Sequence, residues 1–238
     1  MTKFYTLLTI SLTLLAVTST QAQDSDNCEL VYHWSNDELP ASFAHNNTYN
    51  EIWGVVANGR DYAIIGSTMG THIFDITDEG SESEIHFIEG AVTGGNIVHR
   101  DYHDYDGYLY IVCDEGPSTL QIVDISGLPD VIDVVYDSGA LFQRSHNIFI
   151  DADAKMMYVC GGNNQLNLYS LSDPVDPQLV VNCSASVPNW SGTVGYVHDI
   201  YVEDGIAYCN AGGNGLFIVD FTDPTNPQII GDLTDYED

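Results

Sequence analysis

Apolar and polar residues alternate along short stretches of this chain, and the stretches recur at a nearly constant interval. Alternation with a period of two, visible in His198–Val202, is typical of a strand with one buried face. Helix-length stretches with a period of 3.6 are absent after residue 22. The clearest recurrence is a segment ending in a polar turn, found at Gly70–Glu79, Ser118–Pro129, Gln165–Pro174 and Gly215–Pro224. The central residues of these copies stand 46 to 50 positions apart and are Asp75, Asp124, Ser170 and Asp220.

Three further strand-like segments accompany each copy, two before it and one after it. Asn58-Gly59, Asp106-Gly107 and Asp204-Gly205 stand where two-residue hairpin turns require positive φ. Four short antiparallel strands in each repeat predict an all-β fold, a β-propeller of four-stranded antiparallel blades. A β-sandwich or a solenoid is the alternative, but neither needs this period. The four blades are expected at about residues 51–90, 99–139, 146–183 and 198–233.

The N-terminal residues have the pattern of a secretory signal peptide. Lys3 supplies a positive charge, Phe4–Val17 is apolar, and Thr18–Ala22 offers small residues for cleavage after Ala22. The alternative is a buried N-terminal helix, which the abrupt change to acidic sequence after residue 22 disfavours. We therefore expect a signal peptide at residues 1–22 and a protein that is secreted or displayed at the cell surface.

Residues 23–48 form an N-terminal segment ahead of the propeller repeats, which are expected over residues 49–238. Within this segment, Glu29–Trp34 has the composition of a strand and is expected to close the ring against the last blade. Without such closure, a sheet edge would be exposed and the chain would tend to associate. The sequence leaves open a closed four-bladed ring or part of a larger propeller.

Composition narrows the range of partners. The chain has 35 Asp and Glu against 5 Lys and Arg, a formal net charge of −30. Such a charge repels phosphate backbones and anionic lipids, so a nucleic-acid partner is excluded. Disorder does not follow, because 44% of the residues are hydrophobic. No run after the signal peptide approaches the roughly 20 apolar residues of a membrane span, so no membrane insertion is expected after its removal.

The cysteines leave two alternatives open. Five are present, Cys28, Cys113, Cys160, Cys183 and Cys209, and no pair has the spacing of a zinc finger. One unpaired cysteine with two disulfides allows 15 patterns, among which the sequence cannot choose. Buried small hydrophobic residues within strands are the other interpretation.

The repeat core, as in Leu120–Ser126, resembles the LVIVD repeat. The order of further motifs resembles the choice-of-anchor B family of secreted or surface-displayed β-propeller proteins, over about residues 49–233. The motifs are Glu51–Gly54, Gly59–Gly66, Arg100-Asp101, Ser145–Phe149 and Tyr196–Asp199. The resemblance implies an extracellular propeller but no established activity. Family members usually have a longer propeller region and an anchor, so a fragment, a truncated member or a compact four-bladed form is expected.

Alignment of the repeats brings together the starts of the first strands. In a propeller these strands line the axis, so their first residues should converge at one mouth of the central channel. The residues expected to form a binding site there are Trp53, Arg100, Asp101, His146, Asn147, His198 and Asp199. Imidazoles and carboxylates can hold a divalent metal ion or perform acid–base chemistry. The residues expected as metal ligands are His99, Asp101, His146, His198 and Asp199, with His103 nearby. The competing interpretation is that recurrent His and Asp residues only tie neighbouring blades together.

A second set of carboxylates has a simpler explanation. Asp75, Asp124 and Asp220 recur once per blade, and each is followed two residues later by Thr or Ser. Calcium needs six to eight oxygens from closely spaced acids, so turn capping is the favoured, structural role.

Three functions remain. The first is a secreted or cell-surface binding or adhesion module, more consistent with a non-enzyme, whose partner would be an extracellular protein or glycan. The second is an extracellular metal-dependent hydrolase or lyase with a His/Asp site at the channel mouth. The third is a truncated fragment of a longer surface-anchored propeller. The chain carries no nucleophile elbow, phosphate loop or His-Glu-x-x-His motif.

Overall fold

The computed structural model describes residues 30–162 and 165–235, which divide into two units. The described part of the first unit, Leu30–His33, contains no helix or strand, and the expected signal peptide lies outside the described residues. Everything that follows concerns the second unit, Trp34–Asp238. No helix in the described ranges is long and apolar enough to cross a membrane.

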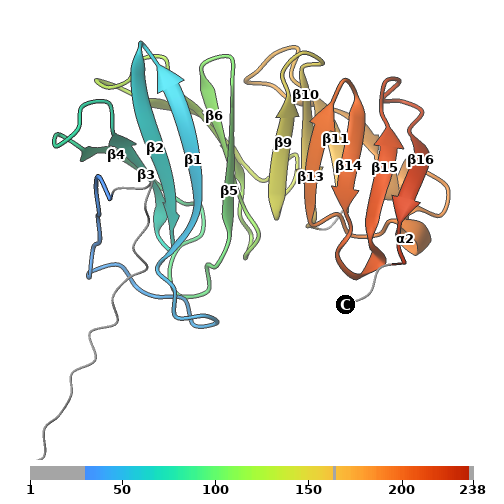
Figure 1. The fold of residues 1–238 in the computed structure, drawn as a ribbon, viewed down its shortest axis with the longest axis horizontal. Coiled ribbons are helices and arrows are strands. Elements are labelled where there is room, and N and C mark those ends of the chain that lie inside the picture. The colour runs from blue at the N-terminus through green and yellow to red at the C-terminus, as the bar shows by residue number, and fades with distance from the viewer. Residues whose placement is uncertain (1–29, 163–164, 236–238) are drawn as a thin grey trace, which may run out of the picture. The chain divides into compact units, whose positions relative to one another are not determined.

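Four antiparallel sheets of four strands follow one another along the chain, coloured from blue to red in Figure 1. Each sheet is a meander in which consecutive strands pair. Blade 1 contains β1 (Tyr49–Ala57), β2 (Arg60–Ser67), β3 (Gly70–Asp75) and β4 (Ser83–Glu89). Blade 2 contains β5 (Arg100–Tyr105), β6 (Tyr108–Cys113), β7 (Leu120–Asp124) and β8 (Asp133–Ser138). Blade 3 contains β9 (Asn147–Asp151), β10 (Met156–Cys160), β11 (Leu166–Ser170) and β12 (Gln178–Asn182). Blade 4 contains β13 (Asp199–Glu203), β14 (Ile206–Asn210), β15 (Leu216–Asp220) and β16 (Gln228–Leu233).

This architecture confirms the predicted all-β fold of four-stranded, propeller-like blades. Three short helical turns accompany the blades: α1 (Cys183–Ser186), α2 (Trp190–Thr193) and a 3₁₀ turn at Gly212–Asn214. The first hairpin turns of blades 1, 2 and 4 have positive φ at both Asx-Gly positions, as the sequence predicts; in blade 1, φ is 52° at Asn58 and 73° at Gly59.

The pairing of the two outer strands is irregular at the same position in every blade. The register shifts between Ile73 and Phe74 in blade 1, with equivalent shifts in blades 2, 3 and 4. A β-bulge increases the local twist of a sheet. The repeated bulge therefore gives the four blades a common outer twist, a feature that the strand pattern alone does not reveal.

Neighbouring blades pack face to face through three apolar cores. Blades 1 and 2 bury residues such as Ile64 and Tyr102, and blades 2 and 3 bury Tyr110 and Met157. Blades 3 and 4 bury Tyr158 and Phe217. The first strands lie side by side in the order β1, β5, β9 and β13.

A row of rings follows these first strands from blade to blade. The ring centroids of Trp53 and His103 lie 4.7 Å apart, those of His103 and Phe149 5.3 Å, and those of Phe149 and Tyr201 5.6 Å. Such separations are typical of tilted and edge-to-face ring pairs. Each blade thus contributes one ring of the row, and the contacts link each first strand to the next.

The ring is not closed among the described residues, where no comparable packing joins β13 to β1. The expected ring-closing strand over Glu29–Trp34 is not formed by residues 30–34, and Glu29 lies outside the described residues. Instead, the Trp34 ring packs against Tyr49, His72 and Phe74 of blade 1 at centroid distances of 5.0–5.4 Å. An aromatic contact on one sheet face thus replaces the expected strand pairing.

The recurrent strand-end carboxylates cap the turns that follow them. Asp75, Asp124 and Asp220 accept hydrogen bonds from the backbone N–H of Thr77, Ser126 and Thr222 at 2.8–3.1 Å. Asp75 has an additional partner, because Arg60 Nε lies 2.7 Å from its Oδ2. The hydrogen bond from Arg60, helped by Thr77, lowers the pKa of Asp75 to about 2.

The Asp75 carboxylate should make stability depend on pH at acid values. Because its pKa is lower in the folded state than in the unfolded state, its contribution is complete above about pH 4 and is lost as the pH falls through about 2. We expect Asp75→Asn to lower the melting temperature at pH 7 and to lose this effect near pH 2. Asp220→Asn is the matched control, since Asp220 caps the same turn without an arginine; its loss at pH 7 should be smaller. Equal losses would contradict the role of Arg60.

Candidate functional site

The starts of the first strands line an open cavity of about 170 Å³. Its wall includes Arg100 and Asp101 of β5, His146 and Asn147 at β9, and His198 and Asp199 at β13, all predicted to meet here. The strands bring these residues together because each blade begins its innermost strand at the same end of the molecule. Glu51 and His99 complete the lining.

Trp53 does not join this group, in contrast to the prediction. It lies within β1 opposite Ile64, and its indole N–H donates to Asp104 Oδ1 at 2.8 Å. The first hairpin of blade 1 is longer than that of blade 2, because Tyr62, the partner of Asp75, is the third residue after Gly59, whereas Tyr108, the partner of Asp124, directly follows Gly107. Glu51 therefore takes the position that Asp101 has in blade 2. His103 is also displaced from the mouth, since its ring lies in the row between Trp53 and Phe149.

Three histidine rings line one side of the mouth. The ring centroids of His146 and His198 are 4.0 Å apart, and those of His99 and His146 are 4.9 Å apart. His146 is therefore the central ring of the three. These rings come from three consecutive blades, 2, 3 and 4, which explains why no local sequence motif contains them.

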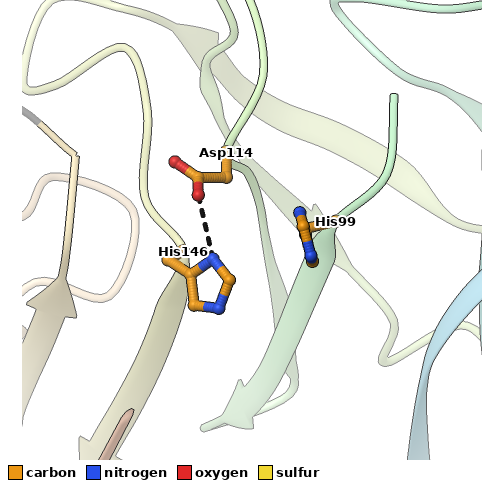
Figure 2. Close-up of side chains that lie close together, drawn as sticks. All are labelled: His99, Asp114 and His146. Carbon is orange, nitrogen blue, oxygen red and sulfur yellow. Dashed lines mark hydrogen bonds and ion pairs between the residues drawn. The ribbon is translucent and has the colours of Figure 1, made fainter. Parts of the chain in front are cut away.

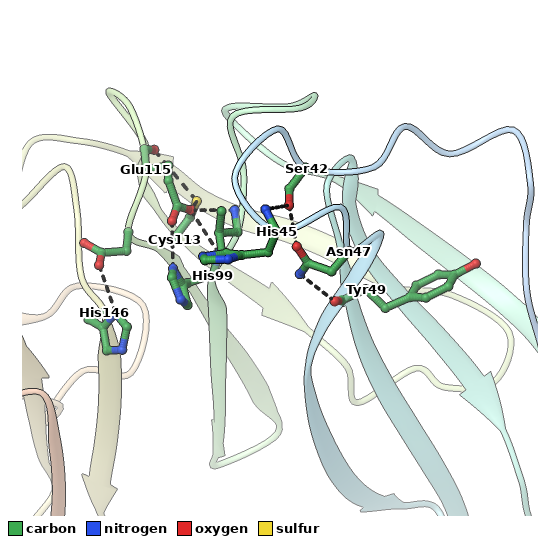
Figure 3. Close-up of polar contacts among 10 residues, drawn as sticks. Ser42, His45, Asn47, Tyr49, His99, Cys113, Glu115 and His146 are labelled. Carbon is green, nitrogen blue, oxygen red and sulfur yellow. Dashed lines mark hydrogen bonds and ion pairs between the residues drawn. The ribbon is translucent and has the colours of Figure 1, made fainter.

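Two carboxylates that the sequence analysis missed orient these rings. Asp114 Oδ2 lies 2.9 Å from His146 Nδ1, as Figure 2 shows. Glu115 Oε1 lies 2.8 Å from His99 Nδ1, and Glu115 Oε2 accepts the backbone N–H groups of Val98 and His99 (Figure 3). Both acids follow β6, which runs antiparallel to β5 and so returns to the end where β5 begins. The antiparallel pairing of β5 and β6 is the signal in the sequence from which Asp114 and Glu115 could have been located at the mouth.

The pKa values of two of the rings are shifted in opposite directions by their surroundings. The hydrogen bond with Asp114 raises the pKa of His146. Burial, followed by the nearby charge of His146, lowers the pKa of His198. His198 therefore favours its neutral form, whereas Asp114 stabilises the protonated form of the neighbouring His146.

The hydrogen bond between His99 Nδ1 and Glu115 also favours one tautomer of His99. A neutral His99 that donates its Nδ1–H to Glu115 presents an unprotonated Nε2, the arrangement found behind many metal-bound imidazoles. Asp114 and His146 Nδ1, in contrast, would share an ion only in place of the proton between them. His99, Asp114 and His146 each offer one ligand atom, and the three atoms lie within 4.8 Å of one another. Of the five predicted metal ligands, His99 and His146 belong to this group, whereas Asp101, His198 and Asp199 line the adjoining cavity wall.

Arg100 and Asp101 mainly hold neighbouring blades together. The buried Arg100 guanidinium donates to Ser67 O and Val92 O, both at 2.9 Å. Asp101 Oδ2 accepts the backbone N–H of Ile148 in blade 3 at 2.7 Å. Such contacts between blades are the role that the competing interpretation predicts, in which polar residues at the mouth only tie neighbouring blades together.

The four described cysteines are free, buried thiols: Cys113, Cys160, Cys183 and Cys209. Burial raises the pKa of Cys209 to about 12, so the thiolate is disfavoured at neutral pH. Among the described residues, the cysteines are therefore small buried hydrophobic residues within the packing, not disulfide partners. Cys28 lies outside them.

The comparison with known families bears on blade 4. Residues 194–235 match the LVIVD repeat. This range contains all four strands of blade 4, so the LVIVD repeat coincides with one propeller-like blade. No curated protein matches the chain.

Asp101 should make stability depend on pH near neutrality. Burial raises its pKa to about 7, against the hydrogen bond from Ile148. Because the folded pKa exceeds the unfolded one, stability is complete below about pH 4 and falls as the pH rises through about 7. We expect the difference in unfolding free energy between Asp101→Asn and the wild type to rise by on the order of 4 kcal/mol between pH 4 and 8, because the wild type loses stability over this range.

Asp199→Asn provides the control for this measurement by denaturant titration. Asp199 occupies the equivalent position of blade 4 but is exposed, so it lacks the burial that acts on Asp101. Its pH curve should run parallel to that of the wild type. An Asp101→Asn curve that also runs parallel would show that the buried carboxyl does not titrate as described.

Proposed function

We propose that this chain is a propeller-type binding module that holds a divalent transition-metal ion at the mouth of its first strands. The observation that carries the proposal is the convergence of His99, Asp114 and His146 within 4.8 Å beside a polar cavity. Secretion, membership of the choice-of-anchor B family and an extracellular protein or glycan partner are parts of the same proposal. The LVIVD match supports the propeller-type module.

The donor set selects the kind of ion. Two imidazoles and a carboxylate suit zinc and similar ions, whereas calcium and magnesium prefer oxygen ligands throughout. Three protein ligands leave a fourth tetrahedral position for water or for a group of a partner. A binding module can use this open position to recognise a carboxylate or a hydroxyl group.

The size of the cavity agrees with an ion rather than a larger ligand. Its volume of about 170 Å³ is below the roughly 300 Å³ at which small-molecule pockets begin. Asn147 Oδ1, in the cavity wall, is buried without a hydrogen-bond partner among the described residues. A buried acceptor needs a donor, and a metal-bound water in the cavity would supply one.

The surrounding contacts support the ligands as they do in established metal sites. Glu115 holds His99 through its ring nitrogen and its backbone N–H, so the ring has one preferred orientation. Loss of such an outer contact typically reduces metal affinity 10- to 100-fold. Glu115 is therefore a positioning residue in this proposal, whereas His99, Asp114 and His146 are ligands.

Calorimetric titration of the metal-free protein with Zn²⁺ tests the proposal. We expect saturable binding of one ion per chain, a loss of at least about 100-fold in affinity for His146→Ala, and a loss of about 10- to 100-fold for Glu115→Gln. His86→Gln is the control, because His86 lies on the outer strand β4 and glutamine can still donate to Pro129 O. It should bind as the wild type does. Absence of one-to-one binding, or an equal loss in the control, would disprove the site.

A further inference from the structure

Blade 4 has a sheet face on which, among the described residues, no further blade packs. We call Tyr201, Tyr208, Leu216, Ile218 and Leu233 the free face of blade 4; they share the side of the sheet that points away from blade 3. Tyr208 occupies the position of Ile64, Tyr110 and Tyr158 in the preceding blades. Those three are 0–1% exposed because the next blade covers them, whereas Tyr208 is 38% exposed.

Blade 1 has the opposite face uncovered. We call Ile52, Val56, Ile65 and Phe87 the free face of blade 1; they lie on the side away from blade 2. Ile52 is 62% exposed, although its equivalents Tyr102, Ile148 and Ile200 are 0–4% exposed against the preceding blade. Trp34 covers the neighbouring His72 and Phe74 but leaves Ile52 and Val56 open.

The two free faces are the two halves of one repeated interface. At each internal interface, the earlier blade contributes the face that is equivalent to the free face of blade 4. The next blade contributes the face that is equivalent to the free face of blade 1. The tether between blades 2 and 3 follows the same relation. Asp101 accepts the N–H of Ile148, and the equivalent pair is the exposed Asp199 and the N–H of Ile52. In this structure each of them bonds only locally, Asp199 to the N–H of Ile200 and Ile52 N–H to Glu51.

We propose that two copies of this chain associate head to tail, with the free face of blade 4 of each copy on the free face of blade 1 of the other. The repeated internal interface determines the occupant, since each free face consists of positions that pack on a neighbouring blade at the three internal interfaces. Two such contacts related by a two-fold axis produce a closed ring of eight blades, which is within the range known for propellers. Pairing of two like faces has no counterpart among the three internal interfaces.

The row of rings and the tether predict specific residue contacts between the two copies. Tyr201 is the last ring of the row and is more than half exposed. Against a second copy it meets Trp53, the first ring of that copy's row, in the way that Phe149 meets Tyr201 itself. Asp199 then accepts the N–H of Ile52 of the second copy. The two acidic copies repel one another, so association should strengthen as salt shortens the screening length to about 3 Å at 1 M.

Sedimentation equilibrium of the full chain in 1 M NaCl over a 100-fold concentration range tests the proposal. We expect a monomer–dimer equilibrium for the wild type. Tyr208→Glu, on the face of blade 4, and Ile52→Glu, on the face of blade 1, should each raise the dimer dissociation constant at least tenfold. Both side chains are exposed in the single copy, so melting curves of the monomers should remain cooperative and confirm that the variants fold.

A mixture of the two variants distinguishes the geometry. The Ile52→Glu copy retains an intact blade 4 face and the Tyr208→Glu copy an intact blade 1 face, so together they form a one-to-one dimer with one native contact. Leu179→Glu adds the same charge at an exposed position of β12 and should leave dimerisation unchanged. Monomers at every concentration would overturn the proposal. A dimer that Ile52→Glu does not affect, or variants that fail to complement each other, would overturn the head-to-tail arrangement.

Discussion

The architecture depends on one constraint, that the sheets of the interior blades are apolar on both faces. In blade 2, Leu109 and Ile111 face blade 1 while Tyr110 and Val112 face blade 3, and all four are buried. A sheet of this kind cannot expose either face to water without a large loss of hydrophobic free energy. Stacking of successive blades is the available solution, and the rings along the first strands link each blade to the next.

The mouth is formed by the stacking of the blades and not by any local sequence motif. Once the innermost strands stand side by side, the residues just before them converge, and each second strand brings its end back to the same place. His146 from blade 3 therefore meets His99 and Asp114 from blade 2. The tethers Arg100 and Asp101 lie immediately beside the candidate ligands, so the contacts that stabilise the blade interface also set the positions of the rings.

Residue patterns alone predict the repeated blades, because strand alternation, Asx-Gly turns and capping carboxylates are local properties of the chain. They place Arg100, Asp101, His146 and His198 correctly at the mouth. Trp53 is misplaced because the first hairpin of blade 1 is two residues longer on each strand than that of blade 2, so that an alignment on the Asx-Gly turns offsets β1 by two residues. Asp114 and Glu115 were missed because their role depends on a return strand rather than on their own segment. Long-range placement of this kind is a property of the assembled sheets.

The strong net negative charge, finally, favours a cation over an anion at the mouth. Two of the five basic residues are engaged elsewhere: Arg60 binds Asp75 at a turn, and Arg100 is directed into the interface between blades 1 and 2. The acids Glu51, Asp114, Glu115 and Asp199 surround the histidines at the mouth. An anionic ligand would meet this field with Arg100 as the only Lys or Arg among the residues that line the cavity, and two of the Arg100 nitrogens already donate to backbone carbonyls of blade 1 and the loop that follows it. A divalent cation gains from the same field, so the acidity that repels phosphate backbones and anionic lipids also favours the proposed metal ion.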